Sequence, residues 1–185
     1  MITQIDVRGI LARVGPDWPD RRDLVTRHTG RAVRSSIETE LALLSGRTVV
    51  VLDFSAVRIL DCSCADEIVA KLVLASLGSE SGLDACFVIR GLNDHQMEDV
   101  DEVLRRQQLI LVADIGGALR LIGEVAEDAR RTFECLAGLG MAAAEELAIE
   151  LARPLEAVRA TLDELTLRHV LLRDSDGYRP PTAAA

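Results

Sequence analysis

The run Thr48–Phe54, with the sequence TVVVLDF, places the strongest constraint on the fold. From Val49 to Leu52 every residue is aliphatic, and no polar side chain interrupts the run. A strand with one wet face alternates apolar and polar residues, whereas a strand buried on both faces remains apolar along its length. We therefore expect Thr48–Phe54 to be an interior strand of a sheet.

Segments with helical and strand patterns alternate around this run. Three segments show apolar residues at spacings of three and four, which indicate helices, and these are Thr29–Leu44, Asp66–Ala75 and Asp94–Gln108. Short apolar runs indicate further strands at Ala85–Ile89 and Leu109–Ala113, and Ile2–Val14 is predicted as a pair of strands. Alternating strands and helices imply parallel crossovers. Residues 1–120 are therefore predicted to form an α/β domain with a mixed sheet.

The pattern changes at about Gly117, after which the sequence predicts mostly helices. Helices are expected at Ala118–Leu139, at Ala142–Leu151 and after Pro154, a residue that favours a helix start. A strand at Val170–Arg173, a turn through Gly177 and a returning strand then complete the segment. Three helices followed by a hairpin is the order of a winged helix. We expect a mostly-α winged-helix domain over residues 121–180 and a disordered tail over residues 181–185.

Composition excludes several classes of function. The formal net charge is -9 and the pI is about 4.9, which disfavours general affinity for nucleic acid because the phosphate backbone is also negative. No apolar run reaches the ~18 residues that span a bilayer, and the first residues lack a signal-peptide pattern, so a cytoplasmic protein without a membrane partner is expected. Cys62, Cys64, Cys86 and Cys135 form no CxxC pair. They are interpreted as buried hydrophobic residues, with no metal and no cofactor expected.

The segment LDFSAVRILDCSCADEI follows from the buried strand into the next helix. A buried strand ending in Asp-Phe-Ser, then an apolar turn, then Asp-Cys-Ser at a helix start resembles the STAS domain of anti-sigma factor antagonists. The strand and helix order fits that family over about the first 120 residues. The resemblance implies a non-enzymatic protein that binds an anti-sigma or kinase-like partner through the helix start, and is released when that partner phosphorylates a serine there.

Five residues of this helix start are the candidate partner-binding or regulatory residues: Asp61, Cys62, Ser63, Asp66 and Glu67. The serine that the family phosphorylates corresponds to Cys62 here, and Ser63 is one position further on, so the chain departs from the family pattern. Each residue also has a structural interpretation. Ser63 can cap the helix, Asp61 can be a cap or turn residue, and Asp66 and Glu67 can be first-turn acids that match the helix dipole.

The C-terminal segment resembles the winged helix-turn-helix of bacterial regulators. That resemblance implies that the helix at Pro154–His169 enters the major groove of DNA, with the hairpin around Gly177 as the wing. The possible DNA-contacting residues are Arg153, Arg159, Arg168, Arg173 and Arg179. Residues 124–185 carry seven basic and twelve acidic residues, a formal charge of −5, which is unfavourable for phosphate contact. A dimerisation or docking module, including a homodimer, is the alternative.

No catalytic pattern accompanies these features. None of the histidines His28, His95 and His169 lies in a nucleophile motif, and no glycine-rich phosphate loop is present. The predicted function is that of a cytoplasmic regulatory protein that is not an enzyme. It binds a protein partner through its STAS-like domain and uses the winged helix as an effector or for dimerisation. The alternative is a DNA-binding transcriptional regulator in which the STAS-like domain senses a signal or dimerises.

Overall fold

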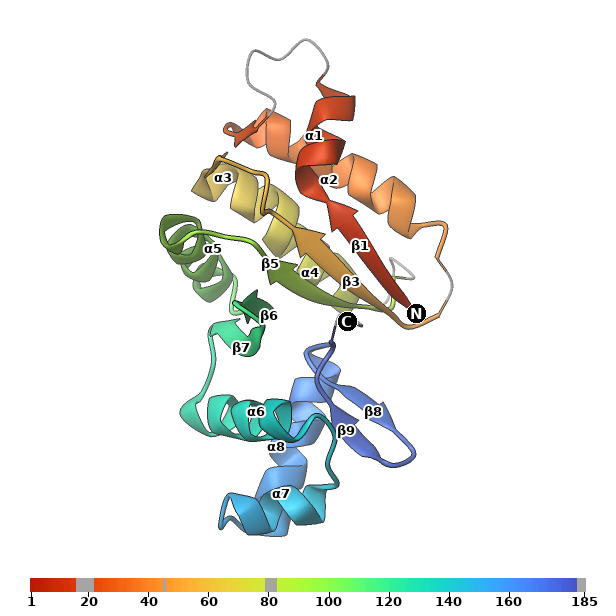
Figure 1. Ribbon diagram of the computed structural model, residues 1–185, viewed down its shortest axis with the longest axis vertical. Helices are drawn as coiled ribbons and strands as arrows, with labels where there is room; N and C mark the ends of the chain where they lie inside the picture. The colour runs from red at the N-terminus through yellow and green to blue at the C-terminus, as the bar shows by residue number, and fades with distance from the viewer. Residues whose placement is uncertain (16–21, 45, 79–82, 183–185) are drawn as a thin grey trace.

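The computed structural model describes residues 1–15, 22–44, 46–78 and 83–182. Its centre is a five-stranded sheet in the order β1-β3-β5-β6-β7 (Figure 1). The strands are β1 (Ile2–Asp6), β3 (Thr48–Asp53), β5 (Ala85–Arg90), β6 (Ile110–Ile115) and β7 (Ala118–Gly123). The first four are parallel and β7 is antiparallel to β6, so the predicted α/β fold with a mixed sheet is confirmed.

The strand β3 is an interior strand, as its apolar run predicted. It pairs with β1 on one side and with β5 on the other, with Leu52 opposite both Ile5 and Ile89. Successive side chains point to opposite faces of a sheet. Val50 and Leu52 accordingly belong to one buried cluster, whereas Val49 and Val51 belong to another. Both faces of the sheet are therefore covered.

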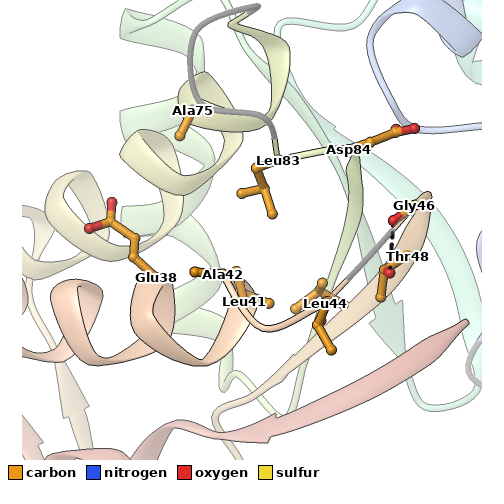
Figure 2. A pocket seen from close by; sticks show the side chains of 10 residues that line it. Glu38, Leu41, Ala42, Leu44, Gly46, Thr48, Ala75, Leu83 and Asp84 are labelled. Carbon is orange, nitrogen blue, oxygen red and sulfur yellow. Dashed lines mark hydrogen bonds between the residues drawn. The ribbon is translucent and has the colours of Figure 1, made fainter.

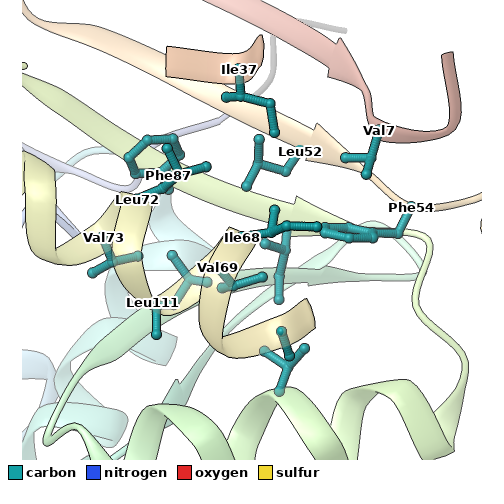
Figure 3. Packing of buried hydrophobic residues seen from close by; sticks show 14 of the residues in the cluster. Val7, Ile37, Leu52, Phe54, Ile68, Val69, Leu72, Val73, Phe87 and Leu111 are labelled. Carbon is teal, nitrogen blue, oxygen red and sulfur yellow. The ribbon is translucent and has the colours of Figure 1, made fainter. Parts of the chain in front are cut away.

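Helices from the first part of the chain cover one face. They are α1 (Val7–Val14), α2 (Arg27–Leu41), α3 (Cys62–Ala65), α4 (Lys71–Leu77) and α5 (Asp94–Arg106), and a π-helical turn at Asp66–Ala70 joins α3 to α4. A short parallel pair, β2 (Asp23–Leu24) and β4 (Ile59–Leu60), precedes α2 and α3. Figure 3 shows how Ile68 and Leu72 from the α3–α4 segment pack against Leu52 and Phe87 of the sheet.

The C-terminal part of the chain covers the opposite face. Its elements are α6 (Glu127–Leu139), α7 (Ala144–Glu150), α8 (Leu155–Leu167), β8 (Leu172–Asp174) and β9 (Gly177–Arg179). Three helices and an antiparallel hairpin thus occur in the expected order, and they lie below the sheet in Figure 1. Their buried residues, such as Phe133 and Leu162, form one cluster with Val49 and Val51 of the sheet. The two parts of the chain therefore share a hydrophobic core.

Two secondary-structure predictions were wrong. The second half of the predicted strand pair Ile2–Val14 is the helix α1, because Asp6 accepts a hydrogen bond from Gly9 N at 3.0 Å and caps the helix. The start of the predicted helix Ala118–Leu139 is the strand β7. It follows a turn in which both Gly116 and Gly117 have positive φ, a conformation that glycine adopts readily.

These findings also affect the predicted boundaries. The strand β7 extends past residue 120, where the sequence divided the chain. Of the predicted tail, Pro181 is buried and Thr182 exposed, while residues 183–185 lie outside the described residues. Across the described ranges, no helix combines the length and apolar character needed to cross a membrane.

Candidate functional site

Asp61 organises the start of α3. Its Oδ1 accepts hydrogen bonds from Cys64 N at 2.7 Å and from Ser63 Oγ at 2.8 Å, and its Oδ2 accepts one from Thr26 N at 3.1 Å. Asp61 is therefore the N-cap of α3, as its structural interpretation predicted. Thr26 precedes α2, so the same carboxylate fixes the starts of two helices relative to each other.

These bonds keep the Asp61 carboxylate ionised. Partial burial opposes ionisation, but the hydrogen bonds from Cys64, Thr26 and Ser63 outweigh it, and the pKa of Asp61 lies below its ordinary value. The alternative in which Ser63 caps the helix is wrong, because its hydroxyl donates to Asp61 and the cap is Asp61 itself. The Ser63 side chain is half-buried at the edge of a cleft.

That cleft has a volume of about 370 Å³ and lies between the starts of α2 and α3 and the end of α5. The residues that line it are Arg27, Cys62, Ser63, Asp66, Val103, Arg106 and Gln107. Two arginines thus lie in the same cleft as the Ser63 hydroxyl. Each already pairs with an acid, Arg27 with Asp66 at 2.7 Å and Arg106 with Glu102.

The Cys62 thiol is not activated as a nucleophile. Its Sγ lies 3.1 Å from Asp99 Oδ1 on α5, and this hydrogen bond, together with burial, raises the pKa of Cys62. A thiol is reactive when its pKa is lowered, so Cys62 remains protonated near neutral pH. The acids responsible are Asp99 and Glu102 on α5, and not the neighbours of Cys62 along the chain.

Glu67 does not lie on the surface that the sequence predicted. Its side chain has 0% exposure and belongs to the π-helical turn, where it points toward α2. The bases within 4.0 Å of its carboxylate are Lys71 (2.6 Å), Arg27 (3.1 Å), Arg34 (3.5 Å) and Arg31 (4.0 Å). We call these five side chains the Glu67 cluster. Because Glu67 is fully buried, it cannot contact a partner directly.

The Glu67 cluster holds α2 against the helix that follows Asp61. Burial opposes ionisation of Glu67, but hydrogen bonds from Lys71 and Arg27 outweigh it and lower the pKa of Glu67. The two helices approach closely at Gly30, where a Cβ atom would lie 2.9 Å from the Glu67 Cβ. The signals that sequence reasoning missed are the spacing of Arg27, Arg31 and Arg34 on one helix face and the Glu67–Lys71 pair four residues apart.

We expect Glu67→Gln to destabilise the protein by about 3 kcal/mol, because it removes the buried carboxylate to which the four surrounding bases are paired. Since the folded pKa of Glu67 is depressed, its contribution is present above the usual glutamate pKa of about 4.3 and is lost as pH falls through the folded pKa. Urea unfolding at several pH values measures this. Glu40→Gln, at an exposed pair with Arg13, is the control and should change stability by less than about 1 kcal/mol.

A second cavity lies between the ends of α2 and α4, as Figure 2 shows. Its volume is also about 370 Å³, and its lining includes Leu41, Leu44 and Leu83. Two carboxylates lie at its border, and each is paired: Glu38 with Arg34 at 2.7 Å and Asp84 with Arg47 at 2.9 Å. This cavity therefore offers mainly apolar contact.

The five candidate DNA-contacting arginines are all paired with acids. The pairs are Arg153–Asp128 (2.9 Å), Arg159–Glu145, Arg168–Glu164 (3.2 Å), Arg173–Asp163 (3.4 Å) and Arg179–Asp174 (2.6 Å). On α8, the exposed Arg159 also lies 3.4 Å from Glu156. Each of these five charges is thus opposed by an acidic neighbour, which is unfavourable for the many simultaneous phosphate contacts that DNA binding requires.

Metal chemistry has no candidate centre within the described ranges. No group of three or more His, Cys, Asp or Glu side chains there could hold a metal ion. Cys64 and Cys86 are buried, and burial raises the pKa of Cys64 to about 12 and that of Cys86 to about 11. Both thiols therefore stay protonated at neutral pH.

The chain was compared with protein-family models, curated proteins and solved structures, and none of them matches it. The resemblances to a STAS domain and to a winged helix therefore rest on the residues quoted for them, and both remain predictions.

Proposed function

We propose that this protein is a non-enzymatic regulator that binds a protein partner through the start of α3. We call the side chains of Asp61, Cys62, Ser63 and Asp66 the α3 surface. The observation that carries the proposal is the fixed position of this helix start. Asp61 bonds to α2 and α3 together, and it holds the Ser63 hydroxyl at the edge of a cleft lined by Arg27 and Arg106.

Three features support binding over catalysis. The Cys62 thiol has a raised pKa, and the Asp61 carboxylate is occupied by three hydrogen bonds. Asp66 pairs with Arg27 and also accepts a hydrogen bond from Gln107 at 3.3 Å. A polar, well-ordered surface of this kind suits recognition, in which the groups are already positioned before the partner arrives.

Phosphorylation is the modification that we expect to alter the charge of the α3 surface most. It adds about −1.5 to −2 charges at a helix start. At Ser63 that charge would lie beside Asp61 and Asp66 but also near Arg27 and Arg106, which line the same cleft. Phosphorylation would thus either weaken binding of a partner that approaches this surface closely, or draw Arg27 and Arg106 away from Asp66 and Glu102. Both routes alter the shape and charge of the α3 surface.

We expect Ser63→Asp to weaken binding of a partner recovered from native lysate by about 1–2 kcal/mol, or about 5–30-fold in affinity. The added charge repels an interface that approaches Asp61 and Asp66. Calorimetry with the purified pair measures the change. Ser35→Asp, which adds the same charge at an exposed position of α2, should leave the affinity unchanged.

The alternative function, DNA binding through α8, is tested in the same experiment. Arg159→Gln removes the exposed arginine of that helix. Unchanged affinity for Ser63→Asp together with lost affinity for Arg159→Gln would place the binding site on the C-terminal part. Nuclease treatment of the lysate then separates a nucleic-acid partner from a protein.

A further inference from the structure

A cleft of about 480 Å³ separates the amino-terminal edge of the sheet from the C-terminal hairpin. We call it the hairpin cleft, and its lining residues are Met1, Ile2, Arg47, Val49, Leu172, Arg173, Asp174 and Arg179. In Figure 1 the β8–β9 hairpin lies below the starts of β1 and β3, and residues from both parts of the chain line the cleft. It shares no residue with the α3 surface, so its role is independent of the proposed function.

Arginines predominate among the charged residues that line the hairpin cleft, although the whole chain is acidic. Among the described residues that line it, three are arginines and one, Asp174, is acidic, whereas the formal net charge of the protein is -9. The arginines come from three sites in the chain: Arg47 precedes β3, Arg173 lies in β8 and Arg179 ends β9. Each arginine also pairs with an acid, Arg47 with Asp84, Arg173 with Asp163 and Arg179 with Asp174. An anion in the cleft would therefore bind through the N–H groups that these pairs leave over.

Each of the three guanidinium groups uses only some of its N–H donors in its ion pair. Within the described part of the chain, Arg47 donates through Nε to Asp84 at 2.9 Å, and Arg179 donates through Nε to Asp174 at 2.6 Å. Arg173 reaches Asp163 through Nη1 at 3.4 Å. A guanidinium carries five N–H donors, so each of the three could bind an anion while keeping its present partner. Exposed ion pairs contribute little to stability, and such an anion competes with them readily.

Arg47 and Arg179 both line the hairpin cleft. Burial raises the pKa of the Cys86 thiol, and the charges of both Arg47 and Arg179 act on that thiol in the opposite direction. Cys86 is opposite Val49 in the pairing of β5 with β3. Arg179 is opposite Leu172 in the hairpin. The sheet side of the cleft thus contributes Arg47, and the hairpin side contributes Arg179.

The remaining lining is apolar and close to these charges. Ile2 is opposite Val49 in the pairing of β1 with β3, and Val49 shares a buried cluster with Leu172. A ligand that fits this lining has an anionic end and an apolar body. Volumes of about 300–1,000 Å³ are typical of sites for small organic ligands, and the hairpin cleft lies in that range.

We propose that the hairpin cleft binds a small phosphomonoester. Its phosphate is held by Arg47 and Arg179, and its apolar group packs on Ile2 and Val49. A phosphate is favoured over a single carboxylate because two guanidinium groups from opposite sides can each bind two of its oxygens. Because the ligand contacts the sheet and the hairpin at once, it stabilises the arrangement of the two parts of the chain.

Calorimetric titration of the full chain with phenyl phosphate tests this proposal. We expect phenyl phosphate to bind at least about tenfold more tightly than inorganic phosphate, which lacks the apolar group, and benzyl alcohol to show no binding. Arg47→Gln and Arg179→Gln should each weaken phenyl phosphate binding by about tenfold or more, since each removes a charge-assisted bond. Arg105→Gln, at an exposed arginine paired with Asp101, is the matched control.

Melting temperatures verify that the variants are folded, because all three substitutions replace surface side chains. The proposal is overturned if phenyl phosphate does not bind the native chain. It is also overturned if Arg105→Gln weakens binding as much as Arg47→Gln does, which would indicate a non-specific effect of charge. Equal affinity for phenyl phosphate and inorganic phosphate would contradict the apolar part of the site.

Discussion

Leu52→Asp is expected to unfold the protein under conditions in which the native chain is stable. Leu52 is 1% exposed at the centre of β3, between Ile5 of β1 and Ile89 of β5. A carboxylate at this position has no base within the surrounding cluster of hydrophobic residues. Burying an unpaired charge costs several kcal/mol, and the lost leucine contacts cost about 2–5 kcal/mol more. A typical domain has only about 5–15 kcal/mol of stability.

Circular dichroism and size-exclusion chromatography measure the outcome. The control is Leu43→Asp, because Leu43 is 85% exposed just after α2, and the same substitution there should melt like the native chain. A Leu52→Asp variant that melts cooperatively within a few degrees of the native protein would show that β3 is not the centre of the fold. It would also remove the basis of the STAS resemblance, which requires a buried strand before the helix start.

The parts of the fold that were predicted correctly have strong local patterns. The apolar residues Val49–Leu52 of β3 are shielded from water only when other segments cover both faces of the strand. The interior position of β3 follows from this requirement. The helices α5 and α8 carry apolar residues at helical spacing, and their bounds agree with the predicted ones within about two residues.

The predictions failed where a pattern fits two structures. The sequence of α1 alternates enough to resemble a strand, and the decisive feature is the cap that Asp6 provides. The strand β7 has exposed residues on its first half, and among the described strands it pairs only with β6. A short edge strand of this kind has no long apolar run, and its identity depends on a turn at Gly116 and Gly117 and on the neighbour that it meets.

The candidate site shows the same division between local and tertiary information. The cap at Asp61 was predictable, because aspartate before a helix is a local signal. The burial of Glu67 was not, because an acid in a first turn is ordinarily exposed. Glu67 can remain ionised while buried because α2 brings Arg27 and Arg34 to it, and these contacts join residues 40 and 33 positions apart.

The packing of the C-terminal part against the sheet also could not be predicted from the sequence. The change in pattern at Gly117 predicted two domains, over residues 1–120 and 121–180. In the structure, the C-terminal helices complete the second face of the sheet. The sheet residues on that face are Val49, Val51, Cys86, Val88, Ile110, Val112 and Leu121. An apolar run such as Val49–Leu52 requires a cover on both faces, but it does not indicate which segment provides it.

Removal of the C-terminal part is therefore expected to abolish independent folding of residues 1–123. Without α6, α8 and the hairpin, the seven sheet residues of that face become exposed together. Burying a valine, leucine or isoleucine side chain contributes about 1.5–3 kcal/mol, so their exposure forfeits on the order of 10 kcal/mol, which is as large as the whole stability of a typical domain. The connections from Arg168 to Gln108 O and from His169 to Ala85 O are also lost.

The truncated chain should be insoluble, or should bind the dye ANS and melt without a cooperative transition, because a large apolar face attracts both dye and other copies. Mixing it with a separately produced segment of residues 124–182 should restore a cooperative transition if that segment supplies the missing cover. A single exposed-residue variant such as Ile149→Ser, at a side chain 81% exposed on α7, should leave the full chain unaffected. If residues 1–123 instead form a soluble monomer that melts cooperatively without binding ANS, the two parts are separate domains, as their sequence patterns predicted, and their shared cluster is only a contact between them.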